Sequence, residues 1–174
     1  PDHVPVVLDP VMIATSGATL IAEDAIAEMR ARLFPLATLI TPNLPELEHL
    51  AGRTLRDTVE VADAAAEIAR TYACHVLAKG GHTDDERIID TLVGPGEERS
   101  AAFGDPRIDT HHTHGTGCTL SSAVATLLGH GLPLEHAVRI GRQFVRRAIL
   151  AAPGFGQGNG PLGHQAVRNQ SPSS

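Results

Sequence analysis

Short runs of apolar residues alternate, in the first part of the chain, with longer segments in which apolar residues recur every three or four positions. An unbroken apolar run predicts a buried strand, whereas the helical spacing predicts a helix with one buried side. The predicted strands are 4–8 (VPVVL), 37–41 (ATLIT) and 75–78 (HVLA). The predicted helices are 22–33, 43–52 and 57–72.

Polar residues and a glycine mark the ends of two of these helices. Asn43 begins the second helix and Gly52 ends it, and Asp57 caps the third. Side-chain oxygens of Asn and Asp accept hydrogen bonds from the first N–H groups of a helix, and glycine adopts the backbone conformation that follows a helix. We therefore expect these helix boundaries to be sharp.

The second half of the chain is predicted to contain two strands and two helices. Strand-like runs at 87–93 and 99–103 surround the sequence GPGEE, which predicts a hairpin. A helix follows Gly115–Cys118 and is broken at 131–133, and another helix covers 134–151. The tail from Gly154 is rich in Gly, Pro, Gln and Ser, and we expect it to be loop and then, over 165–174, disordered.

Strand–helix alternation predicts an α/β layered sandwich with a largely parallel sheet. The composition agrees, because apolar residues make up 42% of the chain and aromatic residues only 3%. A core of Val, Ile, Leu and Ala is typical of a parallel sheet covered by Ala-rich helices. A chain of 174 residues is long enough for one domain.

Charge and cysteine content exclude several classes of protein. The formal net charge of −6 argues against nucleic-acid binding, which requires a basic face. Apolar runs are too short to cross a membrane, and the sequence contains no recognisable signal peptide. Two cysteines are too few for a disulfide framework and fit a reducing cytoplasm. Because the chain opens with PDHVPVVLDP, without Met and almost in a strand, we expect an N-terminal portion to be absent.

Four candidate functional elements directly follow predicted strands or strand-like runs: Asp9, Asn43, Lys79 and the loop Gly115–Cys118. In open α/β sheets, ligands bind beyond the carboxyl ends of the strands. We therefore expect these elements to line one edge of the sheet.

The sequence HGTGCT predicts an anion-binding loop at the start of a helix. Glycines let successive N–H groups point at one spot, where the helix dipole also favours negative charge. The loop is not a Walker motif, because no Gly-Lys-Ser/Thr follows. Cys118 lies at the same helix start, which is expected to lower the pKa of its thiol. Its position in this loop favours a role as a base or nucleophile over that of a small buried core residue.

Three histidines near this loop invite comparison with a zinc site. His111, His112, His114 and Cys118 have no C-x-x-C pair or nearby carboxylate, and their spacing fits no ordinary zinc pattern. We interpret the histidines as polar loop residues, with His114 helping to orient the anion loop.

The remaining candidates each have a structural and a functional interpretation. Asn43 and Glu46 form the N-x-x-E pattern of a helix capping box, which needs no ligand, or lie near magnesium and phosphate. Lys79, beside two glycines, reaches a phosphate or is a solvated lysine at a strand end. Asp9 positions Mg²⁺ through water, or closes a turn before Pro10.

The motifs DPVMIATSG (9–17), LITPNLPELEHLAG (39–52), VLAKGGH (76–82), DTHHTHGTGCTLSSAVA (109–125) and APGFGQGNGPLGH (152–164) resemble those of the hydroxymethylpyrimidine/phosphomethylpyrimidine kinases of thiamine synthesis. The resemblance spans nearly the whole chain in the same order. These enzymes belong to the ribokinase-like superfamily, whose sugar kinases and many pyridoxal kinases carry Asp where Cys118 stands. The family's N-terminal strands have no counterpart here, and its tail is more histidine-rich.

The resemblance implies a three-layer αβα sandwich with a mostly parallel sheet, in which 1–164 form the C-terminal catalytic part of the kinase domain. It implies phosphorylation of 4-amino-5-hydroxymethyl-2-methylpyrimidine by ATP and Mg²⁺, and then of the monophosphate to the diphosphate. It also implies a cytoplasmic homodimer as the complete protein.

The resemblance also implies a role for each matching residue. Gly115, Thr116, Gly117 and Cys118 match the anion hole for the transferring phosphoryl group, and Cys118 matches the proposed base and contacts the substrate. Lys79, Asn43, Glu46 and Thr113 match the nucleotide-binding set. Glu46 and Asp9 match residues near the bound Mg²⁺, and Val11 and Met12 match the segment that approaches the pyrimidine.

Three alternatives stay open at this point. A pyridoxal kinase is the close one, since some cysteine-bearing relatives accept pyridoxal. A truncated, non-catalytic nucleotide-binding module is the second. A cysteine-nucleophile hydrolase is the third, and it needs a base and an orienting partner, of which only His114 is near Cys118.

Overall fold

The computed structural model describes residues 4–14, 17–80, 86–96 and 101–169. The chain divides into two compact units, Pro1–Arg107 and Ile108–Ser174, and each is described by itself.

The first unit is built on one mixed sheet. Its described strands are β1 (Val7–Leu8), β2 (Leu39–Ile40), β3 (His75–Ala78), β4 (Arg87–Val93) and β5 (Ala101–Pro106), in that spatial order. β1, β2 and β3 pair in parallel, whereas β4 pairs antiparallel with both β3 and β5. The predicted hairpin is therefore present, and it makes the sheet mixed rather than largely parallel, because β4 returns directly beside β3.

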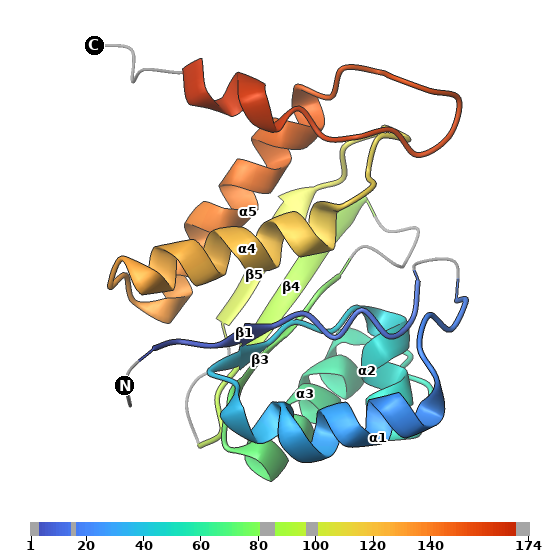
Figure 1. The fold of residues 1–174 in the computed structure, drawn as a ribbon, viewed down its shortest axis with the longest axis vertical. Helices are drawn as coiled ribbons and strands as arrows, with labels where there is room; N and C mark the ends of the chain where they lie inside the picture. The colour runs from blue at the N-terminus through green and yellow to red at the C-terminus, as the bar shows by residue number, and fades with distance from the viewer. Residues whose placement is uncertain (1–3, 15–16, 81–85, 97–100, 170–174) are drawn as a thin grey trace. The chain divides into compact units, whose positions relative to one another are not determined.

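The helices of the first unit are α1 (Glu23–Arg32), α2 (Leu44–Ala51) and α3 (Thr58–Tyr72), with a short 3-10 helix η1 (Phe34–Leu36). They lie together on one side of the sheet (Figure 1). Alternate strand residues point to opposite faces, so Ile40, Val76 and Ala78 join the helices in one core. Phe34 is fully buried in that core and meets the edge of the Tyr72 ring, with centroids 5.0 Å apart.

Local capping explains why α2 and α3 begin where the sequence predicts. Asn43 accepts a hydrogen bond from the backbone N–H of Glu46, and the Glu46 carboxylate accepts one from the N–H of Asn43, so both halves of the capping box are present. The Asp57 side chain accepts from the N–H groups of Val59 and Glu60. The caps satisfy donors that would otherwise have no partner within the helix.

The second unit contains α4 (Thr116–Gly129), α5 (Leu134–Leu150) and the 3-10 helix η2 (His164–Asn169). α4 and α5 pack closely at Gly141, where an added Cβ would lie 3.1 Å from Cγ2 of Val124. The sequence predicts disorder from residue 165, but η2 extends to Asn169 and the N–H of Gly163 donates to the carbonyl of Ala148. Residues 170–174 of the predicted tail lie outside the described residues.

Strand lengths differ most from the prediction. β1 and β2 contain two residues each, although single backbone hydrogen bonds continue the contact beyond them, from the N–H of Thr41 to the carbonyl of Leu8 and from the N–H of Lys79 to that of Pro42. β5 covers Ala101–Pro106 rather than 99–103, and residues 99 and 100 lie outside the described residues. In the part of the chain that the structure describes, every helix is too short or too polar to cross a membrane.

The Asp57 cap gives a direct test of the local account of α3. Replacing Asp57 with Ala removes the acceptor for two N–H groups, and we expect the free energy of unfolding to fall by about 1 kcal/mol. Asp57→Ser should retain most of the stability, and Asp63→Ala, an exposed change on the same helix, serves as the control. Urea unfolding measures all three, and equal midpoints for Asp57→Ala and Asp63→Ala would contradict the capping account.

Candidate functional site

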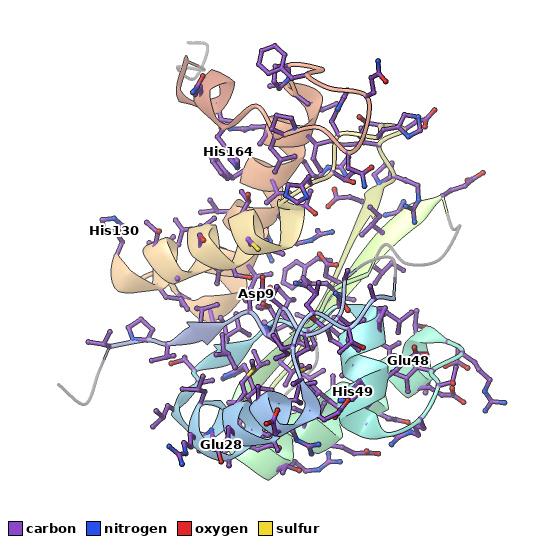
Figure 2. The ribbon with its side chains drawn as sticks, turned by 45° about the vertical axis from the view of Figure 1, so that its right-hand side comes forward. Asp9, Glu28, Glu48, His49, His130 and His164 are labelled. Atoms are coloured by element: carbon purple, nitrogen blue, oxygen red, sulfur yellow. The ribbon has the colours of Figure 1, made fainter. Side chains whose placement is uncertain are left out.

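An ion pair lies at the carboxyl ends of the parallel strands in the first unit. Nζ of Lys79, the residue after β3, lies 2.8 Å from Oδ1 of Asp9, the residue after β1. The Thr41 hydroxyl, directly after β2, donates to the same Asp9 oxygen at 3.0 Å. Both charged side chains are 13% exposed, whereas the side chain of Glu28 is 62% exposed, and Asp9 and Glu28 are labelled in Figure 2. Three strand ends therefore contribute to one polar cluster that is mostly shielded from solvent.

The backbone at Lys79 is held on both sides. Its N–H donates to the carbonyl of Pro42 at 2.9 Å, and it forms an isolated parallel bridge with Asn43. At Gly80 an added Cβ would lie 2.2 Å from the carbonyl oxygen of Ile89, so only glycine allows this close approach of β4. The N–H of Gly80 donates to Oδ1 of buried Asp90 at 2.7 Å. Lys79 is therefore fixed by its neighbours rather than solvated at a free strand end.

Asn43 and Glu46 do more than cap α2. Oε1 of Glu46 accepts the N–H of Met12 at 2.8 Å and lies 3.5 Å from the nitrogen of Ile13, while Oε2 accepts the N–H of Asn43 at 2.8 Å. The Asn43 amide nitrogen donates to the carbonyl of Ile13 at 3.0 Å. The Glu46 residue is 1% exposed. The capping box thus ties the segment after β1 to the start of α2.

Val11 and Met12, the predicted substrate segment, have different environments. The Val11 side chain is exposed and its backbone has a φ of 48°, in the left-handed region. Met12 is fully buried in the core of the first unit. The Met12 side chain is therefore not accessible to a ligand in this conformation. Its direct contact with the substrate stays a prediction.

A cavity of about 330 Å³ lies beside Lys79 and Gly80, on the face of the sheet that α1–α3 cover. Its cations already have partners, because Arg56 pairs with Glu60 and the Arg87 guanidinium donates to the carbonyl of Gly104. The lining is otherwise largely apolar and includes Leu44, Leu47, Leu55, Val61 and Ile89.

Among the described residues no group of three or more His, Cys, Asp or Glu side chains is placed to hold a metal ion. Mg²⁺ in phosphoryl-transfer enzymes is bound by one or two carboxylates together with substrate phosphates, so an all-protein cage is not required. Asp9 and Glu46 both carry carboxylate oxygens of the type that this limited role needs, but both oxygens of Glu46 already accept backbone N–H groups. Asp9 is the more accessible of the two, since Glu46 is nearly fully buried.

The predicted anion loop begins α4 in the second unit. Gly115 has a φ of 84° and precedes the first helical residue, Thr116, without any capping side chain. The N–H of Thr116 donates to the carbonyl of Thr113 at 3.3 Å, so Thr113 is joined to the loop. The left-handed glycine turns the chain into the helix, as the sequence predicts for an anion-binding loop.

Cys118 is exposed in the first turn of α4 and lines an open cavity of about 700 Å³ between α4, α5 and η2. Two further residues of that cavity come from the tail and α5: His164 Nε2 lies 2.9 Å from the Thr119 hydroxyl, and the rings of His164 and Phe144 stack with centroids 6.3 Å apart. His164 is labelled in Figure 2. The tail therefore packs next to the residue that follows Cys118.

The loop histidines have structural contacts. His112 packs against Gly160, where an added Cβ would lie 2.3 Å from its Nδ1, and this nitrogen is buried without a hydrogen-bond partner among the described residues. His114 forms an isolated parallel bridge with Pro161. The contacts join the loop before α4 to the Gly-rich tail, and they agree with interpreting the histidines as loop residues.

The candidate residues thus fall into two groups. Asp9, Asn43, Glu46 and Lys79 are brought together at the carboxyl edge of the sheet, and Thr113 joins Gly115–Cys118 in the second unit. That both groups line one edge stays a prediction.

A family model described as "Phosphomethylpyrimidine kinase" matches residues 1–163. The chain belongs to this family. The hydroxymethylpyrimidine/phosphomethylpyrimidine kinase of Haemophilus influenzae is 40% identical over 162 residues, which cover 92% of this chain and 60% of the relative. The expected family is therefore confirmed.

Solved structures of related kinases share the fold. An ADP complex of Bacillus subtilis pyridoxal kinase has a TM-score of 0.82 at 36% identity and is matched over 95% of this chain and 62% of its own. The Clostridium difficile phosphomethylpyrimidine kinase has a TM-score of 0.71 at 34% identity, over 84% of this chain and 58% of its own. The ribokinase-like α/β fold class is thereby confirmed, and the chain spans about 60% of the length of such relatives.

Three features of the site were not identified from the sequence. Thr41 was included only in a predicted strand, although its position before Pro42-Asn43 places it at a strand end. Asp90 lies within the predicted strand 87–93, and no local pattern indicates that it accepts the N–H of Gly80. The left-handed backbone of Val11 has no sequence signature, because β-branched residues rarely adopt it.

The buried ion pair predicts strong energetic coupling between its partners. Replacing Lys79 with Met leaves a carboxylate that is only 13% exposed without its cation, and we expect the free energy of unfolding to fall by about 2–3 kcal/mol, less than the ~3–5 kcal/mol typical of a fully buried pair. The double change Lys79→Met with Asp9→Asn should cost less than the sum of the single changes by at least about 1 kcal/mol. Urea unfolding of the four proteins gives the coupling, and simple additivity would contradict it.

The two cysteines should differ sharply in reactivity. Burial raises the pKa of the Cys74 thiol to about 11, so near pH 8 only about one molecule in a thousand carries the thiolate there. Cys118 is exposed. We expect iodoacetamide to modify one thiol in the folded chain, Cys118, and both thiols in urea, as measured by mass spectrometry. The variant Cys118→Ser should show no fast modification when folded, and fast labelling of Cys74 would contradict its burial.

Proposed function

We propose that this chain carries the nucleotide and phosphoryl-transfer site of a kinase that phosphorylates 4-amino-5-hydroxymethyl-2-methylpyrimidine and then its monophosphate, in thiamine biosynthesis. The observation that carries the proposal is the Lys79 ammonium, held by Asp9 and the backbone at the carboxyl ends of parallel strands in a member of this family. Ligands of open α/β sheets bind at that edge. A fixed cation there suits the phosphates of ATP.

Phosphoryl transfer depends mainly on positioning and on neutralising charge that develops on the transferring group. In the proposed site Lys79, Asn43 and Thr113 contact the nucleotide, and the loop Gly115, Thr116, Gly117 and Cys118 receives the phosphoryl group. The start of a helix suits this second task, because its N–H groups and dipole favour an anion.

The metal and acceptor sides of the site complete the proposal. Mg²⁺ bound with ATP would neutralise phosphate charge, and Asp9 and Glu46 are the two carboxylates that the resemblance places on the magnesium side of the site. Val11 and Met12 form the acceptor side. Cys118, in its thiolate form, would take the proton of the hydroxymethyl group as the oxygen of that group bonds to the γ-phosphorus of ATP, and ADP leaves. We also propose that the complete protein is a cytoplasmic homodimer, as the sequence resemblance implies.

Pyridoxal is the alternative acceptor, and one observation favours considering it. The Bacillus subtilis protein whose structure matches 95% of this chain is named a pyridoxal kinase. Both acceptors are heteroaromatic alcohols, so the same phosphoryl-transfer site serves either. Family membership favours the pyrimidine.

Product analysis distinguishes these acceptors. The chain is incubated with MgATP and the hydroxymethylpyrimidine, and with MgATP and pyridoxal in parallel, and the products are identified by mass spectrometry. We expect pyrimidine monophosphate followed by diphosphate, and loss of both in the Lys79→Met variant. Pyridoxal phosphate alone would transfer the proposal to the alternative acceptor, and no product from either acceptor would contradict the proposal for this chain.

Cys118 allows a test of the second phosphorylation step. The second acceptor is an anionic phosphate that needs no deprotonation, and a thiol repels it less than a carboxylate does. Replacing Cys118 with Asp should therefore slow the second step by about tenfold more than the first, the equivalent of about 1.4 kcal/mol. Equal losses in the two steps would contradict this role of the thiol.

A further inference from the structure

Val11 has a costly backbone conformation that its own side chain does not explain. Its φ of 48° lies in the left-handed region, which is unfavourable for a β-branched residue. Its side chain is 44% exposed, so packing of that side chain does not hold the backbone there. The other described non-glycine residue with positive φ is Ala73, which simply ends α3.

The residues that follow Val11 are fixed by the start of α2. Glu46 accepts the N–H of Met12 at 2.8 Å, and the Asn43 amide donates to the carbonyl of Ile13 at 3.0 Å. The Met12 side chain is fully buried in the core. Strained backbone persists only where its surroundings determine it, and these bonds supply that constraint one residue after Val11.

The burial of Glu46 also needs a reason beyond helix capping. A capping box requires one carboxylate oxygen for the N–H of Asn43, and that bond is present. Removing a carboxylate from water is costly unless its oxygens are satisfied. The second oxygen is satisfied by Met12, so the buried charge and the strained segment depend on each other.

We propose that Glu46 is a positioning residue that holds Val11 in its left-handed conformation at the carboxyl end of β1, and thereby shapes the acceptor side of the site. The inference rests on the proposed function in one respect, namely that the acceptor is the hydroxymethylpyrimidine. Because both oxygens of the Glu46 carboxylate already accept backbone N–H groups, the inference assigns Glu46 to this segment and leaves Asp9 as the carboxylate available to Mg²⁺. Glu46 therefore acts through the backbone of Val11 and Met12, without contacting the acceptor.

Glycine provides the decisive variant, because it adopts the left-handed conformation without steric cost. In Glu46→Gln one acceptor oxygen becomes an amide donor that faces a backbone N–H, and the segment relaxes. We expect the KM for the hydroxymethylpyrimidine to rise by about tenfold, with the KM for ATP and the half-saturating Mg²⁺ concentration changed by less than about twofold. In the Val11→Gly background the same Glu46 change should raise the acceptor KM by less than about threefold.

Glu48→Gln is the matched control. Glu48 lies on the same helix and its carboxylate also accepts a backbone N–H, that of Leu55, at 2.8 Å. This bond is remote in sequence from the Val11 segment, and Glu48 is labelled in Figure 2. The control should leave the KM values for both substrates unchanged.

Amide hydrogen exchange separates failure of this inference from failure of the proposed function, because it needs no activity. In Glu46→Gln the Met12 and Ile13 amides should exchange at least about tenfold faster, and in Glu48→Gln they should not. The Val11→Gly change should restore part of the lost protection. Unchanged exchange at Met12 in Glu46→Gln would overturn the inference, because Glu46 would then not position this segment. A tenfold shift in the Mg²⁺ requirement of Glu46→Gln that the Val11→Gly change does not rescue would also overturn it, because it would identify Glu46 as a metal ligand.

Discussion

The arrangement of the first unit depends on placing a lysine and an aspartate together where little water reaches them. Lys79 and Asp9 follow two strands that are not neighbours in the sheet, and Thr41 follows the strand between them. A buried charge is tolerated when an opposite charge and hydrogen bonds compensate for lost hydration. The parallel pairing of β1, β2 and β3 brings the carboxyl ends of the three strands to one edge of the sheet. The pairing of these strands and the charge cluster therefore depend on each other.

The start of α2 links this edge to the segment that follows β1. Asn43 lies beside Lys79 in an isolated bridge, and Glu46 on the same helix accepts from Met12. One short helix therefore fixes both the lysine strand and the strained backbone at Val11. This explains how a capping box, which is sufficient to begin a helix, also determines the shape of a candidate binding edge.

The features of this fold and site that depend on local sequence were predictable. The features that depend on tertiary contacts were not. The caps Asn43 and Asp57 determined where α2 and α3 begin, and the structure confirms both. The apolar runs predicted β1 and β2 but not their lengths, since ladder pairing is set by neighbouring strands. Neither the Thr41 hydrogen bond to Asp9 nor the conformation of Val11 has a local pattern, and both require the sheet to exist first.

Hydrogen exchange with and without MgADP tests the central proposal most directly, namely that the strand edge around Lys79 and the start of α4 each bind phosphates of a nucleotide. The account predicts slower exchange in peptides covering 39–46, 76–80 and 113–119, with α1 unchanged as an internal control. Protection of neither group of peptides, or uniform protection that includes α1, would contradict it.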